Sequence, residues 1–194
     1  GLFYVQEPSA CSAVTVLDPQ PGEKVLDLCA APGGKSTQIA GLLEGKGLLW
    51  ANEIVKSRAQ ILLSNGERLG VRNAVVSSCH PQRLCESLQG FFDRVLVDAP
   101  CSGEGMFRRD PEAIAQWSPE SPAACAQRQR AILDSASLAV REGGVLVYST
   151  CTFSREENED NVRWFLDAHP EFQLVPLYLP FGRPGLDGLP VCRI

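Results

Sequence analysis

The sequence predicts an α/β fold built on a doubly wound, mostly parallel sheet. Short apolar runs rich in β-branched residues alternate with longer amphipathic stretches, which is the pattern of a parallel sheet covered by helices on both faces. The chain has 194 residues, of which 44% are hydrophobic and 21% are charged, so it can bury a substantial core. We therefore expect a single domain over residues 1–194.

The individual elements follow from this alternation along the chain. Five short apolar runs are expected to form strands, at 24–28, 48–51, 74–77, 94–97 and 145–149, with a weaker sixth at 172–175. The longer stretches between them are expected to form helices at 36–43, 56–69, 122–140 and 156–168. Since ligands of open α/β sheets bind beyond the carboxyl ends of the strands, polar residues at those ends are candidate site residues.

Charge and hydropathy exclude several classes of protein. The chain has 18 basic and 23 acidic residues and a net charge of −5, so its overall charge cannot hold nucleic acid by counterion release alone. No apolar run approaches the roughly 20 residues of a membrane-spanning helix, and the N-terminus has no signal-peptide pattern. We expect a cytoplasmic protein with no membrane partner.

The eight cysteines are widely spaced in a chain with an ample core. No two of them form a CxxC pair, so we expect no metal site, and the spacing favours free thiols in a reducing compartment over a disulfide scaffold. Cys101 and Cys151 stand apart because they follow the fourth and fifth expected strands, which would place both thiols at one edge of the sheet. The others are expected to be inert small hydrophobic residues: Cys11, Cys29, Cys79, Cys85, Cys125 and Cys192.

The first strand-to-helix connection is a loop of small residues with two glycines, Gly33 and Gly34, which lets a ligand approach the backbone closely. It is not a phosphate-binding P-loop, because Cys29 stands where that motif needs its first glycine. The dinucleotide motif GxGxxG is also missing, which argues against a nicotinamide oxidoreductase. Glu53 follows the second strand at about the distance typical of a ribose-binding carboxylate. On pattern alone, a plain tight turn and a solvated Glu53 remain the alternative.

Several blocks of sequence along most of the chain carry a resemblance to known proteins. They are FYVQEPS at 3–9, CAAPGGK at 29–35, ANE at 51–53, DAPCSGEG at 98–105, WSPES at 117–121 and YSTCTFSREENE at 148–159. In these blocks the chain is similar to the catalytic domain of the RNA cytosine-5 methyltransferases of the Sun/Nop family, and most similar to the bacterial branch that acts on small-subunit ribosomal RNA. The pairing of Pro-Cys at 100–101 with Thr-Cys at 150–151 is specific to this family.

The resemblance implies the Rossmann-like methyltransferase type of fold and S-adenosyl-L-methionine as the cofactor. It implies that Glu53 binds the cofactor ribose, and that Asp98 lies near both the cofactor and the target cytosine. It further implies that Cys151 is the nucleophile and that Cys101 promotes its release. The cofactor loop that it implies consists of Cys29, Ala30, Ala31, Pro32, Gly33, Gly34 and Lys35.

The chemistry explains why a thiolate would be needed. C5 of cytosine is a poor nucleophile until a soft nucleophile adds at C6, which is a form of covalent catalysis. An attack at C6 requires an unstacked base, so the RNA target would be single-stranded or flipped out. Arg108, Arg109 and Arg130 could hold phosphates beside it. Four acidic residues near the last helix are expected to favour its N-terminus without a catalytic role: Glu156, Glu157, Glu159 and Asp160.

Two departures from the family pattern affect what can be expected. Many members carry an acidic residue for the adenine where this chain has His80. Members also carry an RNA-contacting segment before this domain, and the bacterial ones often a further RNA-binding domain after it, so we expect the chain, which begins at Gly1, to be a piece of a longer protein. We also expect it to be a monomer. Two alternatives stay open: a transfer RNA substrate, and a non-catalytic RNA-binding factor in ribosome assembly.

Overall fold

The computed structural model describes residues 3–108 and 110–176 and the backbone of 183–184 and 192–193. The chain divides into two compact units. The sheet unit consists of Gly1–Ala99 and Ser135–Ser149, and the loop unit consists of Pro100–Asp134 and Thr150–Ile194. The expectation of a single domain stays a prediction. In the described part of the chain, no helix has the length and apolar character needed to cross a membrane.

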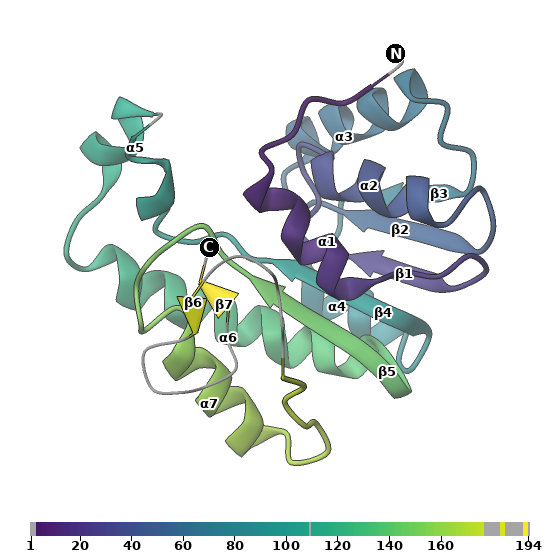
Figure 1. Cartoon of the computed structure of the whole chain (residues 1–194). Coiled ribbons are helices and arrows are strands. Elements are labelled where there is room, and N and C mark those ends of the chain that lie inside the picture. The colour runs from purple at the N-terminus through teal and green to yellow at the C-terminus, as the bar shows by residue number, and fades with distance from the viewer. Residues whose placement is uncertain (1–2, 109, 177–182, 185–191, 194) are drawn as a thin grey trace. The chain divides into compact units, whose positions relative to one another are not determined.

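The sheet unit contains a five-stranded sheet in the order β3-β2-β1-β4-β5, and all of its strand pairs are parallel (Figure 1). This confirms the predicted fold class. Each strand end that the sequence singled out therefore falls at the same edge of the sheet. The strands are β1 (Lys24–Asp27), β2 (Leu48–Asn52), β3 (Ala74–Ser77), β4 (Phe92–Asp98) and β5 (Val140–Ser149).

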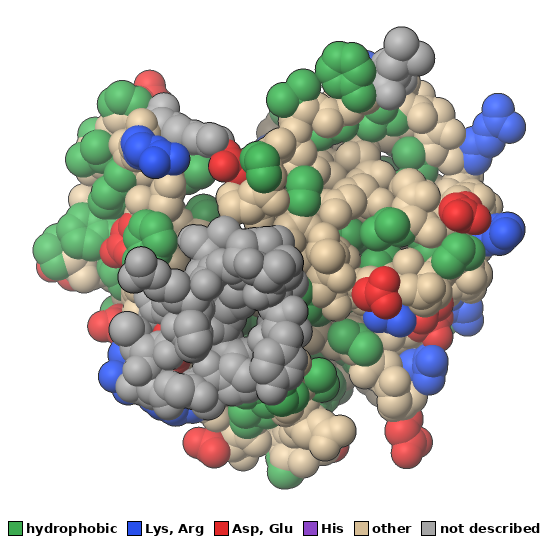
Figure 2. Space-filling model, in the orientation of Figure 1, with side chains coloured by type: hydrophobic (Ala, Val, Ile, Leu, Met, Phe, Trp, Pro, Cys, Tyr) green, Lys and Arg blue, Asp and Glu red, His purple; other side chains and the backbone are tan. Residues whose placement is uncertain are grey.

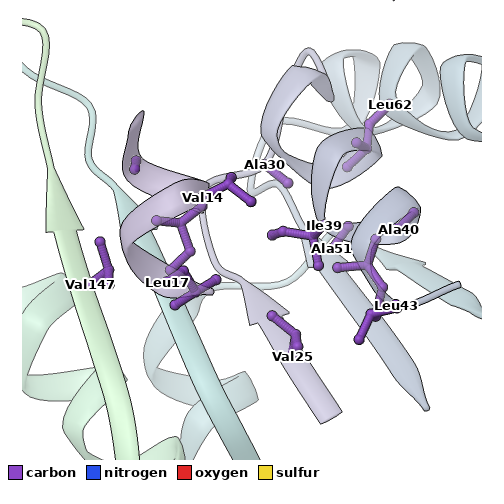
Figure 3. Packing of buried hydrophobic residues seen from close by; sticks show 13 residues of the cluster. Val14, Leu17, Val25, Ala30, Ile39, Ala40, Leu43, Ala51, Leu62 and Val147 are labelled. Atoms are coloured by element: carbon purple, nitrogen blue, oxygen red, sulfur yellow. The ribbon is translucent and has the colours of Figure 1, made fainter. Parts of the chain in front are cut away.

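Helices pack on both faces of this sheet. One apolar cluster combines α1 (Ser12–Leu17), α2 (Gly34–Leu42) and α3 (Lys56–Arg68) with side chains of the strands (Figure 3). Leu17 of α1 and Ile39 of α2 are fully buried there, and burial of each such side chain contributes roughly 1.5–3 kcal/mol to folding. The other face is covered by α4 (Pro81–Ser87) (Figure 1).

The loop unit is made largely of irregular backbone around short helices. After β4 come a 3-10 turn at Glu104–Met106 and helix α5 (Pro111–Gln116), and Phe107 packs edge-on against Trp117. The remaining elements are the first part of α6 (Ser121–Ala139), α7 (Glu159–Ala168) and the antiparallel strands β6 (Arg183–Pro184) and β7 (Cys192–Arg193). A further 3-10 turn, Ser9–Cys11, precedes α1 in the sheet unit.

The expected elements are largely confirmed, with differences at their ends. The strand expected at 172–175 is wrong, because these residues pair with no strand and Phe172 instead packs on Phe165 of α7. The sequence did not predict α1, α4 and α5, since helices of six or seven residues are too short to show a clear period. Arg109 and the side chain of Cys192 lie outside the described residues.

Charged side chains on the visible face of the molecule are mixed in sign. Lys and Arg are scattered among Asp and Glu and form no continuous basic patch on that face (Figure 2). This agrees with the net charge of −5.

Candidate functional site in two units

The cofactor loop runs from the end of β1 to the start of α2. The N–H of Ala30 donates to the carbonyl of Asn52 at 2.8 Å, which fixes the loop against the end of β2. Gly33 caps α2 with a φ of +114°, a conformation that side-chain-bearing residues rarely adopt. A Cβ added at Gly33 would also lie 3.0 Å from Leu62 of α3. The local sequence therefore needs glycine at this position.

A pocket of about 220 Å³ opens beside this loop in the sheet unit. Six of the seven expected loop residues line it together with Asp98, whereas Gly33 does not. The extended N-terminal segment forms the facing wall, a contribution that the expected cofactor residues did not include. The lining residues are Tyr4, Val5, Gln6, Glu7, Ala10, Asp27, Cys29, Ala30, Ala31, Pro32, Gly34, Lys35 and Asp98.

Asp98 ends β4 and is held from two sides. Lys35 Nζ lies 2.6 Å from Asp98 Oδ2, and the Ser149 hydroxyl donates to Asp98 Oδ1 at 2.8 Å. Ser149 is the register partner of Asp98 on the neighbouring strand, so the sheet itself supplies this contact. The two side chains of the ion pair are only 17% and 32% exposed, which leaves a charged pair at the pocket wall.

Glu53 follows β2 but is not among the residues that line the pocket. Its carboxylate is 4% exposed, accepts the N–H of Val55 at 2.9 Å and pairs with Arg58 of α3 at 3.2 Å. Arg58 also donates to the carbonyl of Ala31 in the cofactor loop at 3.1 Å. The alternative of a solvated Glu53 is therefore wrong, while its contact with a ribose stays a prediction.

Asp27 is a buried acid at the end of β1 that also lines the pocket. The Ser36 hydroxyl donates to its Oδ2 at 2.6 Å, whereas its buried Oδ1 has no hydrogen-bond partner among the described residues. Burial raises the pKa of Asp27 to about 7. The unpartnered acceptor on Asp27 could not be inferred from the sequence.

The two cysteines meet in the loop unit. Cys101 Sγ lies 3.2 Å from Cys151 Sγ, and the backbone N–H of Cys151 is 3.4 Å from Cys101 Sγ. A disulfide would need about 2.05 Å, so these are two free thiols in contact. The hydrogen bond with the Cys151 thiol and burial together raise the pKa of Cys101 well above its usual value. Cys101 is partly buried, whereas Cys151 is exposed to solvent.

Gly105 supports the backbone under Cys151. Its N–H donates to the Cys151 carbonyl at 2.8 Å, and a Cβ at this position would lie only 2.6 Å from that oxygen. Only glycine allows this approach. The block that contains Cys101 thus also shapes the turn that presents Cys151.

The remaining expected residues have less direct roles in the structure. His80 is exposed, precedes α4 and does not line the pocket. Arg130 donates to Asn161 at 2.8 Å and lies over the ring of Trp164, so it makes internal contacts in the loop unit. Burial raises the pKa of Cys85 to about 12, in keeping with an inert thiol. The described residues contain no group of three or more side chains that could hold a metal ion.

The prediction that Glu157 belongs to the N-terminus of the last helix is wrong. Helix α7 begins at Glu159, so Glu157 precedes the helix, and its side chain is fully buried. It is hydrogen-bonded to Ser102 and Gln129, which lie 55 and 28 residues away in the sequence. The run of acidic residues after Cys151 gave no indication that Glu157 is buried, because its hydrogen-bond partners come from distant segments of the chain.

A parallel sheet in this strand order, with a small-residue loop after β1 and carboxylates at the strand ends, defines a Rossmann-like methyltransferase fold. The solved precorrin-6y C5,15-methyltransferase of Geobacter metallireducens shares the fold with a TM-score of 0.59 at 19% identity, over 87% of this chain and 73% of that one. The family is narrower: the model of the 16S rRNA methyltransferase RsmB/F family matches residues 14–183, and the chain belongs to this family.

Individual relatives agree with this family. The chain is 44% identical over 191 residues to ribosomal RNA small subunit methyltransferase F of Escherichia fergusonii, and 45% identical over 181 residues to that of Klebsiella pneumoniae. These matches cover 96% and 91% of the chain but only 39% and 38% of the relatives, so the chain spans about two fifths of their length. The structure of NSun6 from Pyrococcus horikoshii, solved with SFG, has a TM-score of 0.86 at 36% identity, over 95% of this chain and 47% of that one.

Proposed function

We propose that this chain transfers a methyl group from S-adenosyl-L-methionine to C5 of a cytosine in RNA, through a covalent bond between Cys151 and C6. The observation that carries the proposal is the pair of free thiols 3.2 Å apart in the loop unit. Membership of the RsmB/F family supports the same chemistry. The names of the relatives favour small-subunit ribosomal RNA over transfer RNA as the substrate.

The pocket of the sheet unit suits a cofactor that carries positive charge. The cofactor has a sulfonium and an amino group, and the pocket wall offers the carboxylates of Asp27 and Asp98. The unpartnered Oδ1 of Asp27 is a buried acceptor that an amino group would satisfy. Residues 29–35, Glu53 and Asp98 would hold the cofactor, which supplies the methyl group when bound.

The thiol pair explains the order of proton transfers. Cys151 loses its proton to solvent and attacks C6 as a thiolate, while Cys101, whose pKa is raised, retains its proton and can donate to the Cys151 sulfur. The C5–C6 electron pair moves toward the ring carbonyl as the bond to Cys151 forms, and on its return it would bond C5 to the methyl carbon, whose bond to the cofactor sulfur breaks and leaves a neutral thioether. Solvent water then takes the C5 proton, the C5–C6 double bond re-forms and the Cys151–C6 bond breaks; we assign Cys101 to promote this release by donating to the departing Cys151 sulfur.

Asp98 is assigned to the target base because its side chain can accept from the cytosine amino group. Lys35 and Ser149 each contact one of its two oxygens. Uracil has a carbonyl in place of that amino group, so the contact would discriminate between the two bases. We further propose that the protein acts as a monomer in the cytoplasm, on a base that is unstacked from its neighbours.

A denaturing gel of protein incubated with S-adenosyl-L-methionine and small-subunit ribosomal RNA tests this proposal. If Cys101 promotes release, Cys101→Ser should accumulate an RNA adduct that survives denaturation. The double variant Cys101→Ser/Cys151→Ser should form none, because the nucleophile is missing. Transfer RNA serves as the competing substrate.

The other outcomes are informative as well. Absence of an adduct in both variants, with cofactor and RNA binding intact, would replace the proposal with that of a non-catalytic assembly factor. Adduct formation with transfer RNA alone would change the substrate. Where RNA fails to bind, the same gel is run with the flanking segments of the relatives attached, and a missing adduct there rejects the chemistry.

A further inference from the structure

A buried carboxylate lies beneath the two thiol-bearing turns of the loop unit. Glu157 is fully buried and accepts hydrogen bonds from the backbone N–H of Ser102 at 3.0 Å and from the Ser102 hydroxyl. The side-chain amide of Gln129 in α6 donates to it at 2.7 Å. Gln129 is also fully buried, so these bonds are shielded from water.

These bonds join the segments that carry the cysteines. Ser102 directly follows Cys101, and Thr152 directly follows Cys151, and their hydroxyl oxygens lie 2.9 Å apart. Gln129 donates to the carbonyl of Pro100 at 3.0 Å, on the other side of Cys101. The backbone is therefore fixed on both sides of Cys101 by the group around Glu157.

A carboxylate is chemically required at this point. Donor hydrogens from the Ser102 N–H, the Ser102 hydroxyl and the Gln129 amide reach its two oxygens. An ionised carboxylate is an acceptor only, whereas the amide of glutamine would turn an N–H group toward at least one of these donors. Asn161 completes the arrangement by donating to Gln129 Oε1 at 2.8 Å, which orients the Gln129 amide.

We propose that Glu157 is a positioning residue that holds the Cys101 turn in contact with Cys151. It acts through Ser102 and Gln129, and its importance for catalysis rests on the function proposed above. Its loss should allow the Cys101 turn to move, so that the thiols spend less time within reach of each other. The geometry can be measured without any methyl transfer, from the rate at which the two thiols join.

The experiment treats the folded protein with diamide, which takes up two electrons and two protons as two thiols become a disulfide. The Cys101–Cys151 disulfide is followed by mass spectrometry of peptides after free thiols are alkylated. Glu157→Gln should slow its formation by about tenfold, in line with the loss of a charged hydrogen-bond acceptor. Glu156→Gln is the matched control, since this neighbouring side chain is exposed, and it should react at the wild-type rate.

Ser102→Ala keeps the test decisive if Glu157→Gln fails to fold. It removes the hydroxyl but keeps the backbone N–H bond, so it should slow the disulfide in the same direction by a smaller factor. The inference would be overturned if a folded Glu157→Gln protein formed the disulfide at the wild-type rate. If Glu157→Gln does not fold, a wild-type rate of disulfide formation in Ser102→Ala would overturn it. Slowed disulfide formation in Glu157→Gln, together with a Cys101→Ser protein that binds RNA and forms no adduct, would keep the positioning role and reject the proposed function.

Discussion

The sheet unit and the loop unit hold their candidate site residues by different means. In the sheet unit, carboxylates at strand ends are paired with cations: Asp98 with Lys35 and Glu53 with Arg58. In the loop unit, Glu157 is bonded by neutral groups of Ser102 and Gln129 and is fully buried. One unit relies on partly exposed ion pairs and the other on buried hydrogen bonds.

This difference matches what each unit would have to do. An ion pair at a pocket wall can exchange partners when a charged cofactor arrives, because water and the incoming charge compensate each side chain. A buried hydrogen-bond group cannot do so without leaving donors unsatisfied, so it fixes distances instead. The comparison suggests adaptable charge around the cofactor and fixed spacing around the thiols.

Cys151→Ser has the largest expected effect and tests whether cofactor binding and the thiol chemistry belong to different units. We expect methyl transfer to fall by at least about a thousandfold, as for removal of other enzymatic nucleophiles. Binding of S-adenosyl-L-methionine, measured by calorimetry, should stay within about twofold of wild type because the pocket belongs to the sheet unit. Equal loss of binding and transfer would show that the thiol is structural and that the two units do not act separately.

Gly105→Ala tests the fixed spacing in the loop unit without removing a sulfur. The new Cβ would lie 2.6 Å from the Cys151 carbonyl oxygen, so the turn must move. We expect methyl transfer to drop by about ten- to hundredfold, the cost of a small misplacement of reacting groups. Gly41→Ala in α2, where a Cβ meets nothing within 4 Å, should leave transfer unchanged. An active Gly105→Ala protein would argue against rigid spacing.

Much of the sheet unit could be predicted from the sequence because short stretches of sequence determine its strands and their ends. Asp98 ends a short apolar strand, and parallel pairing then determines which edge it occupies. The same reasoning brought Cys101 and Cys151 together, since they follow neighbouring strands. The cofactor loop was recognisable because its small residues follow β1 directly.

The hydrogen bonds that hold the turn around Cys101 could not be predicted in this way. Gln129 and Glu157 meet across 28 residues of chain, and Glu157 and Ser102 across 55. No periodic pattern encodes such contacts, and Glu157 stands in a run of acids that resembles an ordinary helix start. Burial alone distinguishes Glu157 from the exposed Glu156, and burial is a property of the tertiary structure.

Asp27→Asn tests the one described carboxyl of the sheet-unit pocket that is fully buried and bonded by a neutral group, the Ser36 hydroxyl. The pKa of Asp27 is raised from 3.8 to about 7, so the native state holds its proton more tightly than the unfolded chain does. This favours the native state at low pH, and the advantage is lost as the pH rises from about 3.8 to about 7. The slope would be at most about 1.4 kcal/mol per pH unit in that interval. Urea unfolding between pH 5 and 7 should show this slope in the wild type and a flatter profile in Asp27→Asn.

Arg58→Gln tests whether the exposed ion pairs of the sheet unit are as adaptable as the comparison suggests. Arg58 pairs with the buried Glu53 and donates to Ala31, so its loss should weaken binding of S-adenosyl-L-methionine. Its side chain is 53% exposed, which limits the expected effect to about two- to fivefold in the dissociation constant. Lys56→Gln, an exposed change in the same helix, is the control for lost surface charge. A loss far above fivefold would mean that the Glu53 ion pair is as rigidly required as the buried bonds of Glu157, and the contrast between the units would then fail.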